Sequence, residues 1–157
     1  IRALIKHRRI PGYKIWLAIY FFQRYKLKHL HHLQLFPGVL STLKTLNQKD
    51  KTLGVISSNS EKIINQTLIN THITYFSFTH SAGFLGKERA LKKVLNKYSL
   101  NPVETVYIGD EIHDIESASK LGIKSAAVTW GFNSRELLSK SHPDYIINYP
   151  KDLLTIK

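Results

Sequence analysis

The chain has 157 residues, a formal net charge of +12 and no cysteine. Its length suits one ordinary domain, and a hydrophobic content of 43% with 22% charged residues argues against a disordered chain. The lack of cysteine excludes disulfides, thiolate metal sites and cysteine nucleophiles. No apolar run approaches the roughly 20 residues of a membrane span, and no signal peptide is visible, so we expect a cytoplasmic protein.

Most of the net positive charge lies in residues 1–49. This stretch contains ten Lys or Arg residues and no acidic residue before Asp50. Such a stretch forms either a solvated helical face, which is the more ordinary outcome, or a surface that faces an anionic partner or substrate. We predict helices across residues 1–35, including a short piece at 4–9 before the break at Pro11-Gly12.

The rest of the chain alternates between helical and strand patterns. Apolar spacing predicts helices at residues 39–46, 61–69, 87–98, 112–121 and 134–138, and a final helical turn at 151–154. Short apolar or β-branched runs predict strands at residues 53–57, 73–78, 105–108, 124–129 and 145–147. This alternation is typical of an α/β fold in which helices sandwich a mostly parallel, Rossmann-like sheet. Ligands bind at the carboxyl ends of the strands in such sheets, so the residues that follow each strand are the candidates for function.

An acidic segment follows the strand predicted at 105–108. Asp110 comes directly after Gly109, and Asp114 lies four residues further on, so both face the same side if a helix begins near Glu111. Converging carboxylates repel one another unless a cation lies between them, and a hard divalent ion such as Mg²⁺ prefers oxygen ligands. An equally supported alternative is that one aspartate caps an exposed, acidic helix start.

Two other positions carry groups that could bind an anion. Ser58 and Asn59 follow the strand at 53–57 and precede a helix N-terminus. Lys87 opens a helix, where the helix dipole disfavours a cation unless that cation faces a phosphate or carboxylates. Each has an ordinary alternative, because Asn59 or Ser60 could simply cap the helix and most single lysines are solvated.

The order and spacing of these segments resemble the haloacid dehalogenase-like (HAD) hydrolase superfamily, especially its phosphoglycolate phosphatase-like branch. The resemblance runs from about residue 35 to the C-terminus. It implies a HAD core at residues 36–157 and the C-terminal part of a helical cap at residues 1–35. The segments that carry it are Leu35-Phe36-Pro37-Gly38-Val39, Gly54-Val55-Ile56-Ser57-Ser58-Asn59-Ser60, Gly86-Lys87, Val106-Tyr107-Ile108-Gly109-Asp110-Glu111-Ile112-His113-Asp114-Ile115 and residues 124–131.

The resemblance implies a phosphate-binding role for three of these residues. Ser58 matches the hydroxyl that hydrogen-bonds the transferring phosphoryl group, with Asn59 beside it and Ser57 as the alternative one position away. Lys87 matches the lysine that neutralises phosphate charge and orients the nucleophile. Phosphoryl transfer depends on this kind of positioning and charge neutralisation.

The resemblance also implies that Asp110 and Asp114 hold Mg²⁺, with Glu111 assisting them. It further implies an Asp-x-Asp motif after an apolar strand in the centre of the sheet, whose first aspartate attacks phosphorus. No aspartate precedes Asp50, residue 1 is Ile and the chain has no Met. We therefore expect a fragment of a longer phosphatase that begins inside the cap, lacks the central strand and is inactive by itself.

The function that these observations favour is a Mg²⁺-dependent phosphatase acting on a small phosphorylated metabolite similar to phosphoglycolate. One alternative is a non-catalytic, truncated paralogue that retains the fold. A less favoured alternative is a basic nucleic-acid-binding module formed by the N-terminal helices, which carry no recognisable nucleic-acid motif. We expect no membrane partner, and the sequence does not define the oligomeric state.

Overall fold

The computed structural model describes residues 12–83 and 86–156. Its helices are α2 (Gly12–His29), α3 (Val39–Gln48), α4 (Glu61–Asn70), α5 (Lys87–Lys97), α6 (Ile112–Ser119) and α7 (Arg135–Ser139). Its strands are β1 (Gly54–Ser57), β2 (Phe78–Ser81), β3 (Val106–Gly109), β4 (Lys124–Val128) and β5 (Tyr145–Ile147). The described residues also contain three short 3-10 helices: η1 (Leu30–His32), η2 (Pro102–Glu104) and η3 (Pro150–Thr155).

All pairs between the described strands are parallel, so the predicted α/β class is confirmed. The strands form two sheets instead of one: β1 pairs with β2, and β3, β4 and β5 pair in that order. Among the described strands, β1 and β3 therefore each have a hydrogen-bonded neighbour on one side only. The resemblance implies a central strand in addition to these five.

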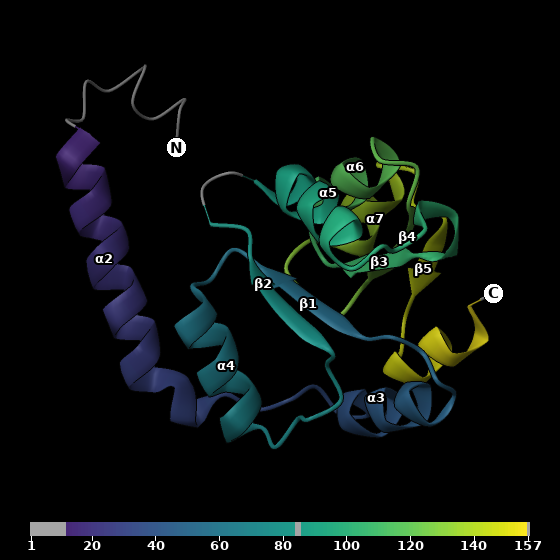
Figure 1. The fold of residues 1–157 in the computed structure, drawn as a ribbon, viewed down its shortest axis with the longest axis horizontal. Coiled ribbons are helices and arrows are strands. Elements are labelled where there is room, and N and C mark those ends of the chain that lie inside the picture. The colour runs from purple at the N-terminus through teal and green to yellow at the C-terminus, as the bar shows by residue number, and fades with distance from the viewer. Residues whose placement is uncertain (1–11, 84–85, 157) are drawn as a thin grey trace.

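One hydrophobic core spans both sheets, with α5 and α6 side by side over it (Figure 1). Its buried residues come from α5, α6 and the turn before β4: Leu91, Leu95, Ala118 and Ile123. Ile56 of β1 and Tyr107 of β3 both pack against this cluster. The two sheets are thus joined through side-chain packing where they share no hydrogen bonds.

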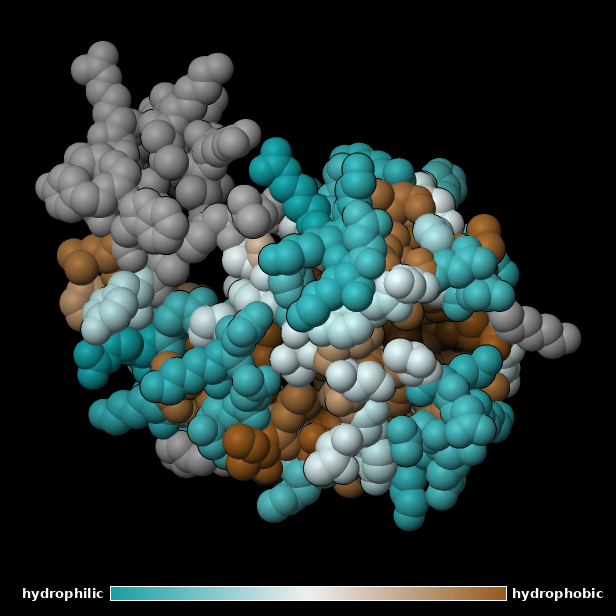
Figure 2. Space-filling view, in the orientation of Figure 1, coloured by the Kyte–Doolittle hydropathy of each residue, from teal (hydrophilic) through white to brown (hydrophobic). Residues whose placement is uncertain are grey.

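Helix α5 is amphipathic, as its apolar spacing predicts. Its inner face is buried and consists of Ala90, Leu91, Val94 and Leu95. Its outer face carries exposed cations, which are Arg89, Lys92, Lys93 and Lys97. Figure 2 shows the hydrophilic surface over this helix. The helix therefore holds Lys87, its first residue, in a fixed position over the core.

The strand predicted at residues 73–78 is wrong, because only Phe78 of that range lies in β2. His72 adopts a left-handed φ of 54°, and the N–H of Ile73 donates to the carbonyl of Leu68, 3.0 Å away. This is the hydrogen bond that closes a helix C-terminus, and an apolar residue commonly accompanies it. Ile73 is buried for that reason. Its β-branched, apolar character reflects the end of α4 and not the start of a strand.

Helix α2 lies along one side of the molecule and packs against α4 and η1 (Figure 1). The helix predicted at residues 4–9 lies outside the described residues. Because α4 belongs to the predicted HAD core, helix α2 of the predicted cap is in direct contact with that core. The boundary between cap and core near residue 35 stays a prediction. No helix in the described part of the chain has the length and apolar character needed to cross a membrane.

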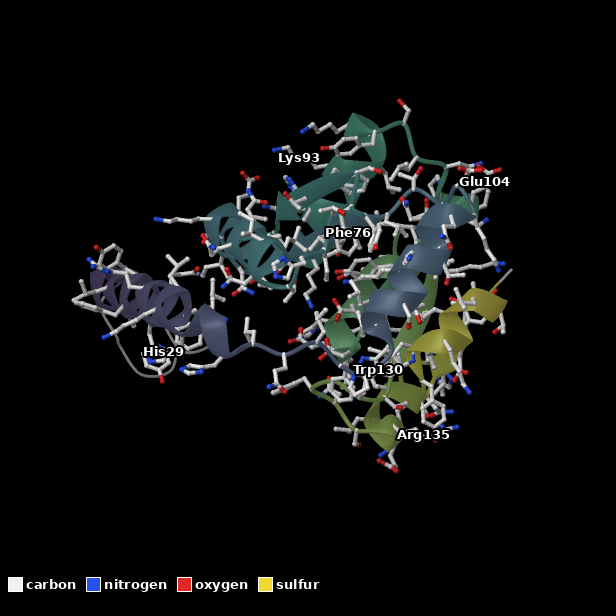
Figure 3. All side chains as sticks on the ribbon, turned by 90° about the horizontal axis from the view of Figure 1, so that it is seen from below. His29, Phe76, Lys93, Glu104, Trp130 and Arg135 are labelled. Atoms are coloured by element: carbon white, nitrogen blue, oxygen red, sulfur yellow. The ribbon has the colours of Figure 1, made fainter. Side chains whose placement is uncertain are left out.

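The loop after β4 is held against the segment that leads into α3. Trp130 is labelled in Figure 3, and its ring centroid lies 6.2 Å from that of Phe36. Phe36 directly precedes Pro37-Gly38, where Gly38 has a φ of 87°. The contact joins the segment before α3 to the loop whose Phe132 N–H donates to Asp110.

Candidate functional site

The acidic segment forms the N-terminus of α6, directly after β3. Asp114 is 3% exposed, and its Oδ2 accepts a hydrogen bond of 3.1 Å from the N–H of Glu111. A Cβ added at Gly109 would lie 2.4 Å from both Cβ and Cγ of Asp114, so only glycine allows this approach. Asp114 is the third residue of α6 and accepts this hydrogen bond from the N-cap residue, Glu111, as in a capping box. The predicted alternative, an aspartate as N-cap of an exposed helix start, is therefore wrong, because Glu111 is the N-cap and Asp114 is buried. The second oxygen of Asp114 remains available for another interaction.

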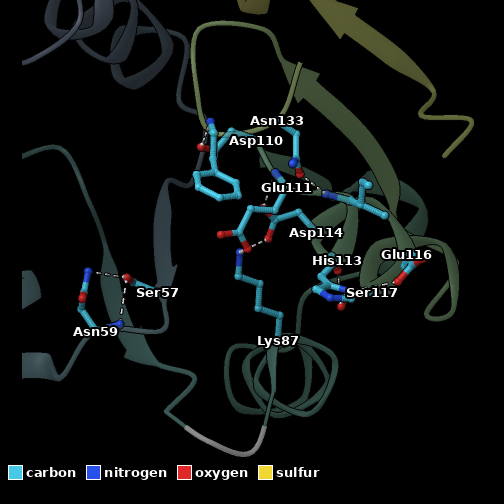
Figure 4. Close-up of polar contacts among 12 residues, drawn as sticks. Ser57, Asn59, Lys87, Asp110, Glu111, His113, Asp114, Glu116, Ser117 and Asn133 are labelled. Atoms are coloured by element: carbon cyan, nitrogen blue, oxygen red, sulfur yellow. Dashed lines mark hydrogen bonds and ion pairs between the residues drawn. The ribbon is translucent and has the colours of Figure 1, made fainter. Parts of the chain in front are cut away.

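Lys87 binds two of the three carboxylates (Figure 4). Its Nζ lies 2.9 Å from Glu111 Oε2 and 2.5 Å from Asp114 Oδ1. Burial by itself would lower the pKa of Lys87, but the hydrogen bonds and charges of Asp114 and Glu111 outweigh it and raise that pKa above its ordinary value. Lys87 is therefore an ammonium ion at neutral pH, and it is paired and not solvated.

Asp110 is held by the loop after β4. Its Oδ2 accepts a hydrogen bond of 2.7 Å from the N–H of Phe132, and its backbone carbonyl accepts one of 3.1 Å from the N–H of Asn133. A Cβ at Gly131 would lie 2.1 Å from the Cβ of Asp110. Within the described residues, Asp110 forms no ion pair with Lys87. Asp110 therefore lies next in sequence to Glu111 but is not part of the ion-pair cluster of Lys87, Glu111 and Asp114.

Asn133 is a site residue that the sequence reasoning missed. Its Oδ1 accepts a hydrogen bond of 3.0 Å from the N–H of Ile112, the first residue of α6. Asn133 therefore fixes the same helix start as Asp114, from a position 21 residues further along the chain. Asn133 follows Trp130-Gly131 at the end of a predicted strand, and this position could have marked it as a candidate site residue.

The turn after β1 presents one exposed serine and one engaged serine. Ser57 Oγ accepts hydrogen bonds from the backbone N–H and the side-chain amide of Asn59, at 3.2 and 3.3 Å (Figure 4). Ser58 is exposed and lines a hollow together with Lys87 and Glu111. Its neighbours around this hollow favour Ser58 over Ser57 as the phosphate ligand, and the assignment stays a prediction.

The carboxylates fit a divalent cation by charge and by donor type. Asp110, Glu111, Asp114 and Lys87 have a formal sum of −2, and Asp114 Oδ1 is buried without a well-aligned hydrogen bond. Burial, followed by the negative charge of Asp114, raises the pKa of Tyr107, so its hydroxyl adds no charge. Mg²⁺ typically binds one or two carboxylates and fills its other positions with water and phosphate oxygens.

The three carboxylates do not converge on one point as the sequence suggests. Within residues 12–83 and 86–156, no group of three or more Asp, Glu or His side chains lies close enough to hold a metal ion. The reason is visible in the contacts, because Lys87 holds Glu111 while the loop after β4 holds Asp110. The group fits a cation whose coordination is completed by other oxygen ligands.

The fold and this group of residues together define an α/β protein with a polar site at the carboxyl ends of β1 and β3. A family model described as haloacid dehalogenase-like hydrolase matches residues 2–128. The chain belongs to this haloacid dehalogenase-like hydrolase family.

Two curated relatives illustrate the similarity. A phosphoglycolate phosphatase of Synechococcus elongatus is 39% identical over 124 residues, which are 78% of this chain and 58% of that protein. The pyrophosphatase PpaX of Oceanobacillus iheyensis is 30% identical over 137 residues, which are 82% of this chain and 63% of that protein. The chain thus spans about three fifths of the length of these relatives.

Solved structures share the fold. A haloacid dehalogenase-like family hydrolase of Streptococcus pneumoniae superposes with a TM-score of 0.83 at 25% identity, covering 93% of this chain and 71% of that one. A predicted phosphatase of Clostridium acetobutylicum superposes with a TM-score of 0.84 at 23% identity, covering 99% of this chain and 76% of that one. At 23% identity, the similarity to the Clostridium acetobutylicum structure shows a shared fold and nothing more.

Proposed function

We propose that this chain is part of a Mg²⁺-dependent phosphatase that acts on a small phosphorylated metabolite such as phosphoglycolate. The observation that carries the proposal is the pairing of Lys87 with Asp114 and Glu111, next to Ser58, at the carboxyl ends of two parallel strands. The names of the two curated relatives support the same reaction class. A cytoplasmic location stays a prediction.

Each residue would have a distinct task at a bound phosphoryl group. The Lys87 ammonium would neutralise phosphate oxygens and the Ser58 hydroxyl would donate a hydrogen bond to one of them. Asp110 and Asp114 would hold Mg²⁺, with Glu111 positioning Lys87 from its other side. The bound Mg²⁺ would supply further neutralisation of charge on the phosphoryl group.

We propose that residues 1–157 bind phosphate without hydrolysing its esters. Hydrolysis of the family's type needs an aspartate nucleophile, and no aspartate precedes Asp50. Asp50 lies in the turn between α3 and β1, which is at the amino end of β1. Ser58 follows the carboxyl end of the same strand, so Asp50 is at the wrong end to attack a phosphoryl group there.

Calorimetric titration with inorganic phosphate in the presence of Mg²⁺ tests this proposal. We expect the wild type to bind phosphate and Ser58→Ala to bind it about tenfold more weakly, since one hydrogen bond to a charged group contributes roughly 1.5 kcal/mol. Ser57→Ala is the matched control and should bind within about twofold of the wild type, because its hydroxyl is engaged within the turn.

Hydrolysis of p-nitrophenyl phosphate and 2-phosphoglycolate is measured on the same samples. We expect no turnover above the buffer rate. Robust Mg²⁺-dependent turnover by residues 1–157 would show that the nucleophile assignment is wrong. A wild type that binds no phosphate with Mg²⁺ present would refute the proposed site and favour the non-catalytic paralogue.

A further inference from the structure

The loop after β4, residues 130–133, lies against the acidic turn that Asp110 and Glu111 form between β3 and α6. A Cβ added at Gly131 would lie 2.1 Å from the Cβ of Asp110, so the two segments are as close there as glycine permits. The N–H of Phe132 donates a hydrogen bond of 2.7 Å to Asp110 Oδ2, across 22 residues of sequence. Two distant segments of the chain therefore meet at one carboxylate.

Asn133 forms hydrogen bonds on both sides of Glu111. Its backbone N–H donates one of 3.1 Å to the carbonyl of Asp110, and its side-chain Oδ1 accepts one of 3.0 Å from the N–H of Ile112 (Figure 4). Glu111 lies between these two residues and is the N-cap of α6. Asn133 thus fixes the peptide groups on either side of Glu111, whose carboxylate pairs with Lys87.

The Asn133 side chain holds the loop to the acidic turn. Ile112 is the first residue of α6, and its N–H is one of the helix-start donors that have no partner within the helix. Asn133 Oδ1 supplies that partner. The Phe132 ring is 80% exposed, so Phe132 contributes a backbone donor and little packing. Trp130 joins the start of the loop to Phe36, before α3.

The position of the loop decides how Asp110 is presented. The hydrogen bond from the N–H of Phe132 sets the direction of the Asp110 carboxylate, and it forms only while the loop stays against the turn. A ligand group that is already oriented binds more tightly than one that must be ordered on binding, because the ordering costs free energy. Any side chain that holds this loop therefore contributes to the affinity of a cation bound by Asp110.

We propose that Asn133 is a positioning residue for the divalent cation: its side chain holds the loop after β4 against the acidic turn, and the loop orients Asp110. This inference rests on the proposed function, because it assumes that Asp110 and Asp114 hold Mg²⁺. It assigns a role in cation binding to a neutral side chain that is not itself a ligand. By thermodynamic linkage, a bound cation should in turn stabilise the loop.

The test measures cation affinity in variants of one side chain. Mn²⁺ alone is the probe, because it takes the same oxygen ligands as Mg²⁺ and its free form is quantified by electron paramagnetic resonance. Asn133→Ala removes the acceptor for the N–H of Ile112, whereas Asn133→Asp keeps one. Asn148→Ala is the matched control, since Asn148 is exposed after β5 and its Oδ1 accepts from Arg135 and not from the acidic turn.

Two further measurements separate positioning from a purely structural role. Hydrogen exchange of the Phe132 amide, followed by NMR, reports whether the loop stays on Asp110. Urea denaturation reports the stability of the same samples. We expect Asn133→Ala to bind Mn²⁺ about tenfold more weakly than the wild type, with an exchange rate about tenfold higher at the Phe132 amide. Asn133→Asp should bind at least as tightly as the wild type, and Asn148→Ala within about twofold of it.

Several outcomes would overturn the proposal. An Asn133→Ala variant that is less stable but binds Mn²⁺ as tightly as the wild type would show that Asn133 serves the fold alone. Weaker Mn²⁺ binding with unchanged exchange at Phe132 would show that the effect does not pass through the loop. Asn133→Asp as weak as Asn133→Ala, or equal weakening in Asn148→Ala, would also contradict it. A wild type that binds no Mn²⁺ would refute the metal site of the proposed function, and this inference with it.

Discussion

Replacing Asp114 with alanine is expected to lower the free energy of unfolding by about 3 kcal/mol, which is the cost typical of breaking a buried ion pair. The change removes the acceptor for the N–H of Glu111 and leaves Lys87 with a single carboxylate. Urea denaturation followed by circular dichroism measures the loss. Asp114→Ala should also bind phosphate in the presence of Mg²⁺ far more weakly than the wild type.

Two control variants separate the contributions of Asp114. Asp114→Asn keeps an oxygen that can accept from Glu111 and should lose less stability, while its phosphate binding should fall as far as that of Asp114→Ala. Glu116 lies on the same helix, is exposed and, among the residues that the structure describes, forms an ion pair with His113 alone, so Glu116→Ala should change stability by less than about 0.5 kcal/mol. An Asp114→Ala variant as stable as Glu116→Ala would contradict the role of the buried pair.

Replacing Gly109 with alanine is expected to cost about 2–3 kcal/mol, in the upper range for overpacking. The Cβ added at residue 109 would lie 2.4 Å from Cβ and Cγ of Asp114. The Cβ of Asp114 is fixed to the backbone of α6, so it cannot move away unless the helix shifts. The shift would also displace the carboxylate from Lys87. Thermal unfolding and phosphate titration of the same variant measure both effects.

Gly122→Ala is the matched control for Gly109→Ala. Gly122 has a φ of 67°, but no atom lies within 4 Å of the position that its Cβ would take. Alanine there should cost about 1 kcal/mol for the left-handed backbone and leave phosphate binding unchanged. Equal stability losses in the two variants, or normal phosphate binding by Gly109→Ala, would show that the close approach to Asp114 is unimportant.

The sequence predicted correctly those site positions that depend on the order of helices and strands along the chain. The alternation of helices and strands placed Ser58 after β1 and Asp110 after β3, and Gly86-Lys87 at the start of α5. These positions depend on short-range periodicity, which the printed sequence contains. The alternative of an N-cap aspartate was wrong, because Glu111 is the N-cap residue of α6 and the buried Asp114, at the third helical position, accepts from its backbone N–H.

Contacts between distant segments were not predictable in the same way. Nothing in the spacing indicates that Lys26 reaches Asn59 or that Phe132 binds the Asp110 carboxylate. Both depend on how loops and helices pack after the strands are in place. The error at Ile73 has a related cause, because a buried apolar residue at a helix end has the same composition as the start of a strand.

The most direct test of the site is the dependence of phosphate binding on Mg²⁺ in the wild type and in Asp110→Asn. Asparagine keeps an oxygen that can accept from the N–H of Phe132, so the variant should retain the fold and the loop after β4. We predict that phosphate binds the wild type with Mg²⁺ and not with excess chelator, and that Asp110→Asn fails to bind it in either condition. Phosphate binding of equal affinity in the chelator, or in a folded Asp110→Asn, would contradict a metal-assisted phosphate site at the ends of β1 and β3.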